Sequence, residues 1–466
     1  MLFSSYTFLF LFLPAVLLLY FLLPLCLPPR RRLAVRNGVL LLMSLLFYAW
    51  GEPVYVFLML GTVLANFLFG LWLARCRHRR TALCLAVGFD LFLLFFYKYA
   101  GALAALFSLP FPAVRLPLGI SFYTFQALSY VVDVYRGEVP AEKNPATFGT
   151  YVALFPQLVA GPIVRYSDVA GELTARTHTA ARAAAGVRRF VAGLCKKVLL
   201  ANTAGALFST YTTGETPSFL GAWLALLGFA FQIYFDFSGY SDMALGLGAI
   251  FGFTFPENFN YPYTGVSFTD FWRRWHITLS AFFREYVYIP LGGNRKGRLR
   301  TVFNLFVVWT LTGLWHGAAF SFLLWGIYWF LLLFLEKLVF PHLPFHLPRP
   351  LRHAVTLGGI LFGWLIFAFD GSSAALSPAA FCRFFGALFG AAGFAHGNAG
   401  YDFVRHLPFL AICAVGSTPL PRTLFRRFFA ARRTAWAGVV LPLAGMVLAV
   451  SYLADAGYNP FLYFRF

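Results

Sequence analysis

Long apolar runs separated by short clusters of basic residues dominate the chain. Residues 1–29 carry no charged side chain, and the uncharged runs Val54–Ala74 and Thr434–Ala454 are each 21 residues long. A helix rises about 1.5 Å per residue, so about 20 apolar residues cross a hydrocarbon core of roughly 30 Å. The pattern therefore predicts membrane-spanning helices, with further candidate spans at Gly38–Trp50, Thr81–Tyr97, Leu116–Val134 and His353–Phe369.

One uncharged run is too long for a single crossing. Thr301–Leu335 extends for 35 residues without a charge, which is about 50 Å if it is helical throughout. Such a length would require an extreme tilt. We therefore expect the run to break at Gly313–Gly317 and to form two helices or one broken helix.

The segment Phe268–Tyr286 has a different pattern. On a helical wheel its large apolar side chains fall on one side, and Asp270, Arg273, Arg274, Arg284 and Glu285 fall on the other. This distribution is typical of an interfacial amphipathic helix, lying on the bilayer or packed at its edge. Ala175–Gly193 is a candidate for a second amphipathic helix.

Composition and charge sharpen this interpretation. Hydrophobic residues make up 60% of the 466 residues and charged residues 12%, against about 45–50% and roughly 25% in soluble domains. The net charge is 37 − 17 = +20, but the basic residues flank the apolar runs, as the positive-inside rule describes. This argues against a nucleic-acid partner and predicts a lipid bilayer as the surroundings. The cluster Arg30–Arg32 places the N-terminus outside.

The pattern as a whole predicts an all-α polytopic bundle of about 10–12 spans, with a single domain over residues 1–466. The six cysteines are scattered without a C-x-x-C pair, so neither a disulfide framework nor a zinc site is predicted.

Two of the nine histidines stand out; the other seven, His178 among them, fall in or near expected loops. His316 lies inside the long uncharged run, where an ionisable group is costly unless it faces a cavity or a partner. It is therefore a candidate for function; the alternative is a neutral imidazole bonded to a backbone carbonyl at the helix break. His276 lies at the border of the amphipathic wheel, where a histidine is more often an ordinary interfacial residue with its polar tip in water.

A polar knot interrupts two apolar stretches at Asp236–Asp242, with sequence DFSGYSD. Its carboxylates, Asp236 and Asp242, and its hydroxyl at Ser238 must be buried in protein or line water if they lie at membrane depth. The alternative is a polar turn that caps two helices. Two aspartates are weak evidence for a metal, and we predict none.

Four stretches together resemble the membrane-bound O-acyltransferases (MBOAT), in the bacterial branch that contains the alginate O-acetyltransferase membrane subunit. They are Ser121–Arg136, Leu154–Tyr166, Gly313–Gly317 (GLWHG) and Phe231–Arg300, which includes FPENFNYPY and FWRRWHITLSAFFREYVYIPLGGNRKG. The tail Asn459–Phe466 also fits. One departure is Glu285, where the family motif has Asp; the charge is kept.

The resemblance implies a helical membrane bundle with a central tunnel and core motifs in residues 231–335. An acyl thioester arrives from the cytoplasm and the acceptor alcohol from outside. His316 corresponds to the catalytic histidine of the family and His276 to a second functional position. Further candidates for the substrate site or tunnel are Trp315, Trp275, Asp236, Ser238, Asp242 and Asn258.

The chemistry agrees with this implication. A base must remove the hydroxyl proton as the oxygen attacks the thioester, and an imidazole suits neutral pH. Gly313 and Gly317 flank His316, and we expect these small residues to let a substrate approach closely. The basic loop Arg295–Arg300 would attract the phosphates of coenzyme A or an acidic carrier protein, unless it only obeys the positive-inside rule.

We therefore expect an O-acetyltransferase of the bacterial cytoplasmic membrane. Its donor substrate would be acetyl-CoA or an acyl carrier protein, with no bound cofactor, and its acceptor a cell-envelope polysaccharide, reached directly or through a periplasmic partner protein. One alternative is a D-alanyl transferase acting on teichoic acid with a carrier-protein donor. Others are a transporter or flippase, which would need inverted repeats and intramembrane acid–base pairs, and an inactive scaffold subunit.

Overall fold

The computed structural model describes residues 1–112, 114–213, 216–342, 347–429 and 436–455. Within these ranges all regular secondary structure is helical. The contacts divide the chain into two compact units: Met1–Leu194 with Tyr240–Glu257, and Cys195–Gly239 with Asn258–Phe466. The all-α prediction is confirmed, and the single domain over residues 1–466 stays a prediction.

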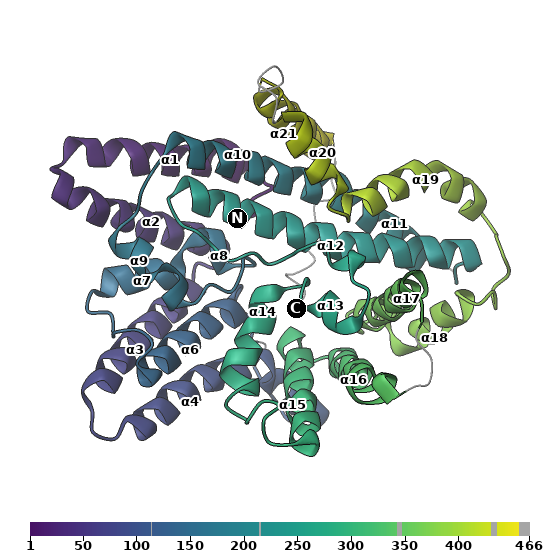
Figure 1. Cartoon of the computed structure of the whole chain (residues 1–466), viewed down its shortest axis with the longest axis horizontal. Helices are drawn as coiled ribbons and strands as arrows, with labels where there is room; N and C mark the ends of the chain where they lie inside the picture. Colours follow the sequence, from purple (N-terminus) through teal and green to yellow (C-terminus); the bar gives the residue numbers. More distant parts are fainter. Residues whose placement is uncertain (113, 214–215, 343–346, 430–435, 456–466) are drawn as a thin grey trace. The chain divides into compact units, whose positions relative to one another are not determined.

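The first unit consists mainly of helices that follow the predicted apolar runs. They are α1 (Leu13–Leu22), α2 (Pro29–Gly51), α3 (Tyr55–Arg75), α4 (Arg79–Lys98), α5 (Ala100–Leu106), α6 (Ile120–Arg136), α7 (Pro145–Ala153), α8 (Phe155–Leu158), α9 (Tyr166–Thr174) and α10 (Ala180–Cys195), with short π or 3₁₀ turns at Thr7–Phe12 and Leu23–Cys26. Helices α3, α4 and α6 pack side by side (Figure 1). A Cβ on Gly70 of α3 would overlap the ring of Tyr130 on α6, so the glycine permits this close packing.

The second unit carries the motifs of the candidate site. Its helices are α11 (Asn202–Thr212), α12 (Phe219–Ile250, whose last part belongs to the first unit), α13 (Phe268–Trp272), α14 (Ile277–Phe283), α15 (Arg298–His316), α16 (Phe320–Phe334), α17 (Arg349–Ala368), α18 (Pro378–Ala387), α19 (Ala399–Gly416), α20 (Leu420–Phe429) and α21 (Ala437–Asp455). Shorter π or 3₁₀ turns lie at Lys196–Ala201, Pro262–Thr264, Arg284–Tyr288, Leu335–Val339, Phe340–His342 and Ala374–Leu376.

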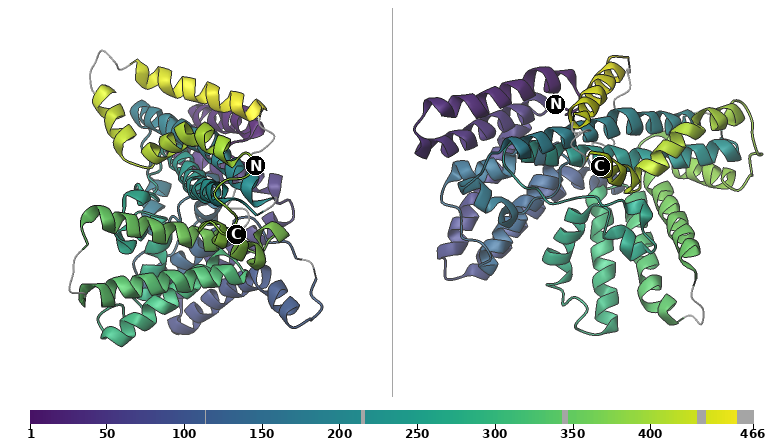
Figure 2. Two further views of the ribbon diagram at one scale, coloured as in Figure 1. Left: turned by 90° about the vertical axis from the view of Figure 1, so that its right-hand side faces the viewer. Right: turned by 45° about the horizontal axis from the view of Figure 1, so that its top comes forward.

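Helices α15, α16 and α17 lie side by side (Figures 1 and 2). The predicted break at Gly313–Gly317 is confirmed, because α15 ends at His316 and α16 begins at Phe320. The expectation that Gly313 leaves room for substrate is wrong. A Cβ there would collide with the backbone oxygen of Phe322, and one on Gly326 with that of Trp309. These glycines let the two helices touch.

Nine helical segments in the described residues are long and apolar enough to cross a membrane. They include α3, α4, α12 and α17, and their outer faces expose large apolar side chains such as Phe57 and Leu64. Exposed side chains of this kind suit contact with lipid rather than water. The polytopic prediction is therefore confirmed. The predicted span Thr434–Ala454 corresponds to α21 from Ala437 onward, and the tail Asn459–Phe466 lies outside the described residues.

Two local predictions were wrong. Phe268–Tyr286 is not one helix, because α13 ends at Trp272 and α14 begins only at Ile277. The alternative that Asp236–Asp242 forms a polar turn capping two helices is also wrong, because these residues lie inside the uninterrupted helix α12. At about 1.5 Å per residue this helix is about 48 Å long. The second amphipathic segment is helical, as expected, in α10.

Candidate active site

The two singled-out histidines are buried in the second unit at the ends of helices. His316 is the last residue of α15 and is 7% exposed, and Gly317 continues in extended conformation. His276 precedes α14 and is 2% exposed. Its backbone is left-handed, with φ 43° and ψ 55°. Non-glycine residues in that region cost free energy, and such strain is often kept at functional sites.

Trp315 links the two imidazoles. Its ring centroid lies 4.9 Å from that of His316 and 5.9 Å from that of His276. The ring of Phe237 on α12 lies 4.7 Å from the ring of His276 and is nearly perpendicular to it. The structure thus brings together His316, His276 and Trp315, which lie up to 40 residues apart in the sequence.

His316 lies among aromatic rings. Trp325 of α16 and Phe367 of α17 contact it at 5.0 and 5.1 Å, both close to perpendicular. Phe322 lies at 6.3 Å. Surroundings of this kind exclude water and favour a neutral imidazole, which is the form that can accept a proton.

Asn258, which is 1% exposed, holds His276 at one ring nitrogen. Its Oδ1 lies 3.0 Å from His276 Nδ1, and Thr278 donates to the same oxygen from its backbone N–H at 3.3 Å and from its hydroxyl at 2.9 Å. His276 lies outside the nine candidate spans, and burial lowers its pKa to about 3. The ring is therefore neutral at pH 7.

Asp236 and Ser238 flank Phe237 on α12 and are both 2% exposed. Asp236 forms a buried ion pair with Lys197, whose Nζ lies 2.7 Å from Oδ1 and also donates to Asn202 at 3.1 Å. In the sequence Lys197 ends a basic cluster that begins at Arg188, which is the pattern of a loop lysine, but its side chain is only 2% exposed. The pair holds α12 to the chain that precedes α11.

Asp242 belongs to the other unit. It lies 2.9 Å from Arg189 of α10, which also pairs with Glu257 at 2.5 Å. Within the described first unit these contacts make Asp242 part of a partly exposed ion-pair network.

Trp275 contributes to an aromatic core beside the site. Its ring lies 4.7 Å from Trp364 and 5.1 Å from Phe259. Trp364 in turn packs on Trp325 at 6.4 Å, and Trp325 contacts His316. Trp325, Phe367 and Lys197 could not be predicted as neighbours of the candidate residues, because nothing in their spacing distinguishes them from lipid-facing or loop residues.

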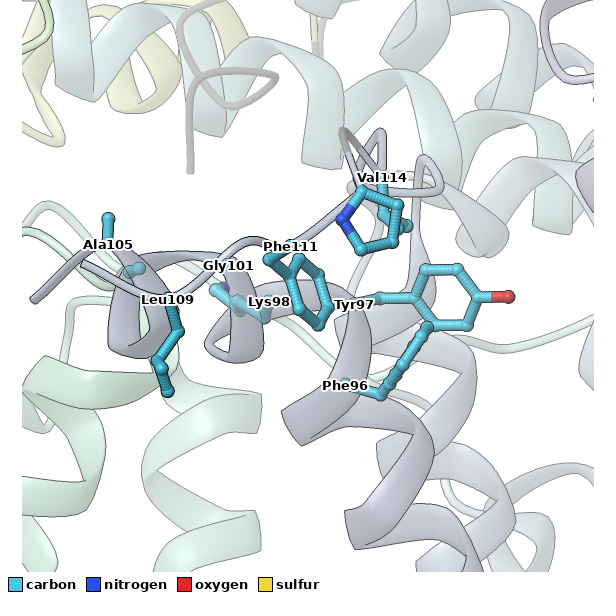
Figure 3. A pocket seen from close by; sticks show the side chains of 10 residues that line it. Phe96, Tyr97, Lys98, Gly101, Ala105, Leu109, Phe111 and Val114 are labelled. Atoms are coloured by element: carbon cyan, nitrogen blue, oxygen red, sulfur yellow. The ribbon is translucent and has the colours of Figure 1, made fainter. Parts of the chain in front are cut away.

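Each unit also has a hollow. In the first, one of about 400 Å³ lies between the end of α4, α5 and the segment that follows (Figure 3). Its lining includes Tyr97, Phe111 and Lys98, whose Nζ donates to Ser121 at 3.3 Å. The lining contains neither a histidine nor a carboxylate, so it offers no acid–base pair.

The hollow of the second unit has a volume of about 370 Å³ and lies next to the ends of α11 and α17. Its wall includes Phe369. Two residues earlier in the chain, Phe367 packs on His316. The side chains of Tyr211, Thr212, Thr213, Thr216 and Arg383 also line it. A hydroxyl-rich hollow therefore lies at the end of the helix that packs on the candidate base.

No group of three or more His, Cys, Asp or Glu side chains in the described residues could hold a metal ion. That there is no metal site stays a prediction. The six cysteines, all in described residues, are free thiols.

Membrane-crossing helices and two buried histidines at helix ends define a polytopic membrane protein with a candidate acid–base site. A family model described as "MBOAT, membrane-bound O-acyltransferase family" matches residues 142–377. The chain belongs to this family, and it is an O-acyltransferase.

Three relatives illustrate the range of similarity. The probable alginate O-acetylase AlgI of Pseudomonas aeruginosa is 42% identical over 79% of this chain and 72% of its own length. The peptidoglycan O-acetyltransferase of Helicobacter pylori is 34% identical over 81% of this chain and 78% of its own length. The teichoic acid D-alanyltransferase of Bacillus subtilis is 30% identical over only 45% of this chain and 56% of its own length.

Proposed function

We propose that the protein transfers an acetyl group from a thioester donor to hydroxyls of a cell-envelope polysaccharide, directly or through a periplasmic partner protein. The relatives that cover about four-fifths of the chain are named as O-acetylating enzymes. The D-alanyltransferase matches less than half of it. This difference in coverage favours acetyl over D-alanyl transfer. The same relatives support a location in a bacterial inner membrane.

His316 is proposed as the general base. The observation that carries this role is its place at the end of α15, buried among Trp315, Trp325 and Phe367. As the acceptor oxygen bonds to the thioester carbonyl carbon, the imidazole takes the hydroxyl proton. The carbon–sulfur bond then breaks, and the proton passes to the leaving thiolate. An ester and a free thiol result.

His276 is proposed to hold the acceptor hydroxyl. Because its ring is neutral and Nδ1 faces Asn258, Nε2 is the nitrogen that can accept a hydrogen bond. The hydroxyl-rich hollow beside Phe369 supports an acceptor that is itself rich in hydroxyls.

The donor is proposed to be acetyl-CoA or an acetylated carrier protein on the cytoplasmic side. Arg295, Lys296, Arg298 and Arg300 are all exposed between Pro290 and the first turn of α15. Cations of this kind attract phosphates. Because the same cluster also satisfies the positive-inside rule, it supports the cytoplasmic side more strongly than the donor.

The experiment compares cells that lack the gene with cells that carry it as wild type or His316→Ala, at equal membrane protein levels. The measurement is base-labile acetate released from envelope polysaccharide. Wild type should restore it, and His316→Ala should not. Equal restoration by both would remove His316 from the mechanism, and ester-linked D-alanine in place of acetate would establish the teichoic-acid alternative.

A further inference from the structure

Asn258 concentrates three hydrogen bonds on one side-chain oxygen. The donors around Oδ1 are His276 Nδ1, the Thr278 backbone N–H and the Thr278 hydroxyl, at 3.0, 3.3 and 2.9 Å. The backbone oxygen of Asn258 also accepts from the N–H of Ile277 at 3.0 Å. Asn258 therefore fixes the residues on both sides of the point where α14 begins.

These bonds determine which ring nitrogen of His276 carries the proton. A backbone N–H can only donate, so the atom that faces Thr278 N must be the amide oxygen and not the amide nitrogen. The same oxygen faces His276 Nδ1. Because an amide oxygen can only accept, Nδ1 must be the protonated nitrogen of the neutral imidazole, and the lone pair lies on Nε2.

We infer that Asn258 is a positioning residue, which holds His276 in the Nδ1–H tautomer so that Nε2 accepts a hydrogen bond from the acceptor hydroxyl. The inference rests on the proposed role of His276. In the opposite tautomer Nε2 would carry a hydrogen and repel the hydroxyl hydrogen. Asn258 does not touch the reacting atoms in this account; it acts through the ring that it holds.

A purely structural role is the competing explanation. The first N–H groups of a helix lack partners within it, and Asn258 satisfies those of Ile277 and Thr278. Asn144 provides a matched control, because its side chain accepts from Ala146 N and Thr147 N at the start of α7. Both asparagines cap a helix, but only Asn258 has a histidine ring on the same oxygen.

The decisive readout is the tautomer, measured by ¹⁵N NMR of histidine-labelled protein in lipid, with His276→Gln to assign its signals. Wild type should show a protonated Nδ1 and a lone-pair Nε2. Asn258→Ala should lose this pattern and lower kcat about 10²-fold or more, since a wrong tautomer costs up to about 10⁴-fold. Asn144→Ala should reduce thermal stability and leave both the tautomer and kcat unchanged.

Asn258→Asp tests the same idea from the opposite side. Its carboxylate keeps the acceptor and the helix cap, so Nδ1 should stay protonated and stability should be retained. The negative charge favours the imidazolium, so activity should begin to fall at a higher pH than in wild type. The side chains that pack on the His276 ring from α12 and α15 are Phe237 and Trp315, and neither of them titrates. The titratable residue that follows Trp315 in the chain is His316.

A protonated Nε2 in wild type, or an unchanged pattern in Asn258→Ala, would overturn the positioning role. Loss of kcat in Asn144→Ala as large as in Asn258→Ala would assign the effect to helix capping. Neither result depends on the identity of the base. Full activity of His316→Ala would instead overturn the proposed mechanism, whatever tautomer His276 shows.

Discussion

His178 in the first unit and His276 in the second are held in opposite tautomers. At His178 the Arg36 guanidinium, which can only donate, lies 3.2 Å from Nδ1. Nε2 therefore carries the proton and donates to Tyr20 Oη at 2.8 Å, and that hydroxyl donates to the Phe251 carbonyl at 2.7 Å. At His276 the amide oxygen of Asn258 requires the proton on Nδ1.

The difference separates a histidine with a structural role from one that we propose to act on the substrate. Both ring nitrogens of His178 have hydrogen-bond partners. Nδ1 accepts from Arg36, and Nε2 donates to Tyr20, whose hydroxyl donates to the Phe251 carbonyl. The lone pair of His276 is on the nitrogen opposite Asn258, and its ring packs against Phe237 and Trp315. Partners that fix a ring while directing its lone pair elsewhere are typical of catalytic histidines.

The largest expected contrast is kinetic. His276→Gln should lower kcat/KM about 10²-fold or more, because a positioned imidazole acting on a reacting hydroxyl contributes on that scale. His178→Gln should leave the activity per folded molecule unchanged. The measurement is acetyl transfer by purified protein in lipid, normalised to the folded fraction. Equal losses in the two variants would abolish the distinction.

A second contrast concerns two carboxylates of the same motif, Asp236 and Asp242. Removing Lys197 leaves the carboxylate of Asp236 buried, so Lys197→Met should cost about 3–5 kcal/mol of stability. Arg189→Met removes a partner from the partly exposed Asp242 and should cost about 1 kcal/mol or less. Thermal unfolding of the two variants measures both, and a Lys197→Met effect as small as that of Arg189→Met would contradict the buried pair.

A smaller effect is expected at Tyr20, which is fully buried. Tyr20→Phe removes the acceptor of His178 and the donor to Phe251, and an unsatisfied buried polar group costs about 1–3 kcal/mol. The melting temperature should fall while kcat stays constant. A loss of kcat without a loss of stability would show that the hydrogen-bond chain of the first unit takes part in the reaction.

The smallest contrast is the dependence of stability on pH. Burial lowers the pKa of His276 to about 3, and burial with the charges of Arg36 and Arg176 lowers that of His178 to about 4. Unfolded histidines titrate near 6.5, so between these values the unfolded chain binds more protons. Stability should fall as the pH drops below about 6.5. The fall between pH 7.5 and 5 should be shallower in His276→Gln, and a slope equal to that of wild type would contradict the neutral buried ring.

Much of this arrangement follows from the sequence. Apolar run length predicts α3, α4 and α17, and the excess length of Thr301–Leu335 predicts the break that places His316 at the end of α15. The family motifs single out both histidines. These signals are local, since each depends on the length or periodicity of one segment.

The rest depends on contacts between distant segments. The wheel cannot show that α13 and α14 are separated at His276, because the break is stabilised by Asn258, which lies 18 residues earlier. Lys197 has the sequence pattern of a cytoplasmic lysine, and only its contact with Asp236 shows that it is buried. His178 has the sequence pattern of a loop residue. Its hydrogen bond with Arg36 could not be predicted, because the two residues are 142 positions apart.

We propose that His316 is the base of acetyl transfer and that His178 takes no part in it. The most direct test measures base-labile acetate on envelope polysaccharide in cells lacking the chromosomal gene, complemented with His316→Ala or His178→Ala at equal membrane protein levels. His316→Ala should give no acetate above background, and His178→Ala should give wild-type acetate per folded molecule. Acetate restored by His316→Ala to the wild-type level would contradict the proposal.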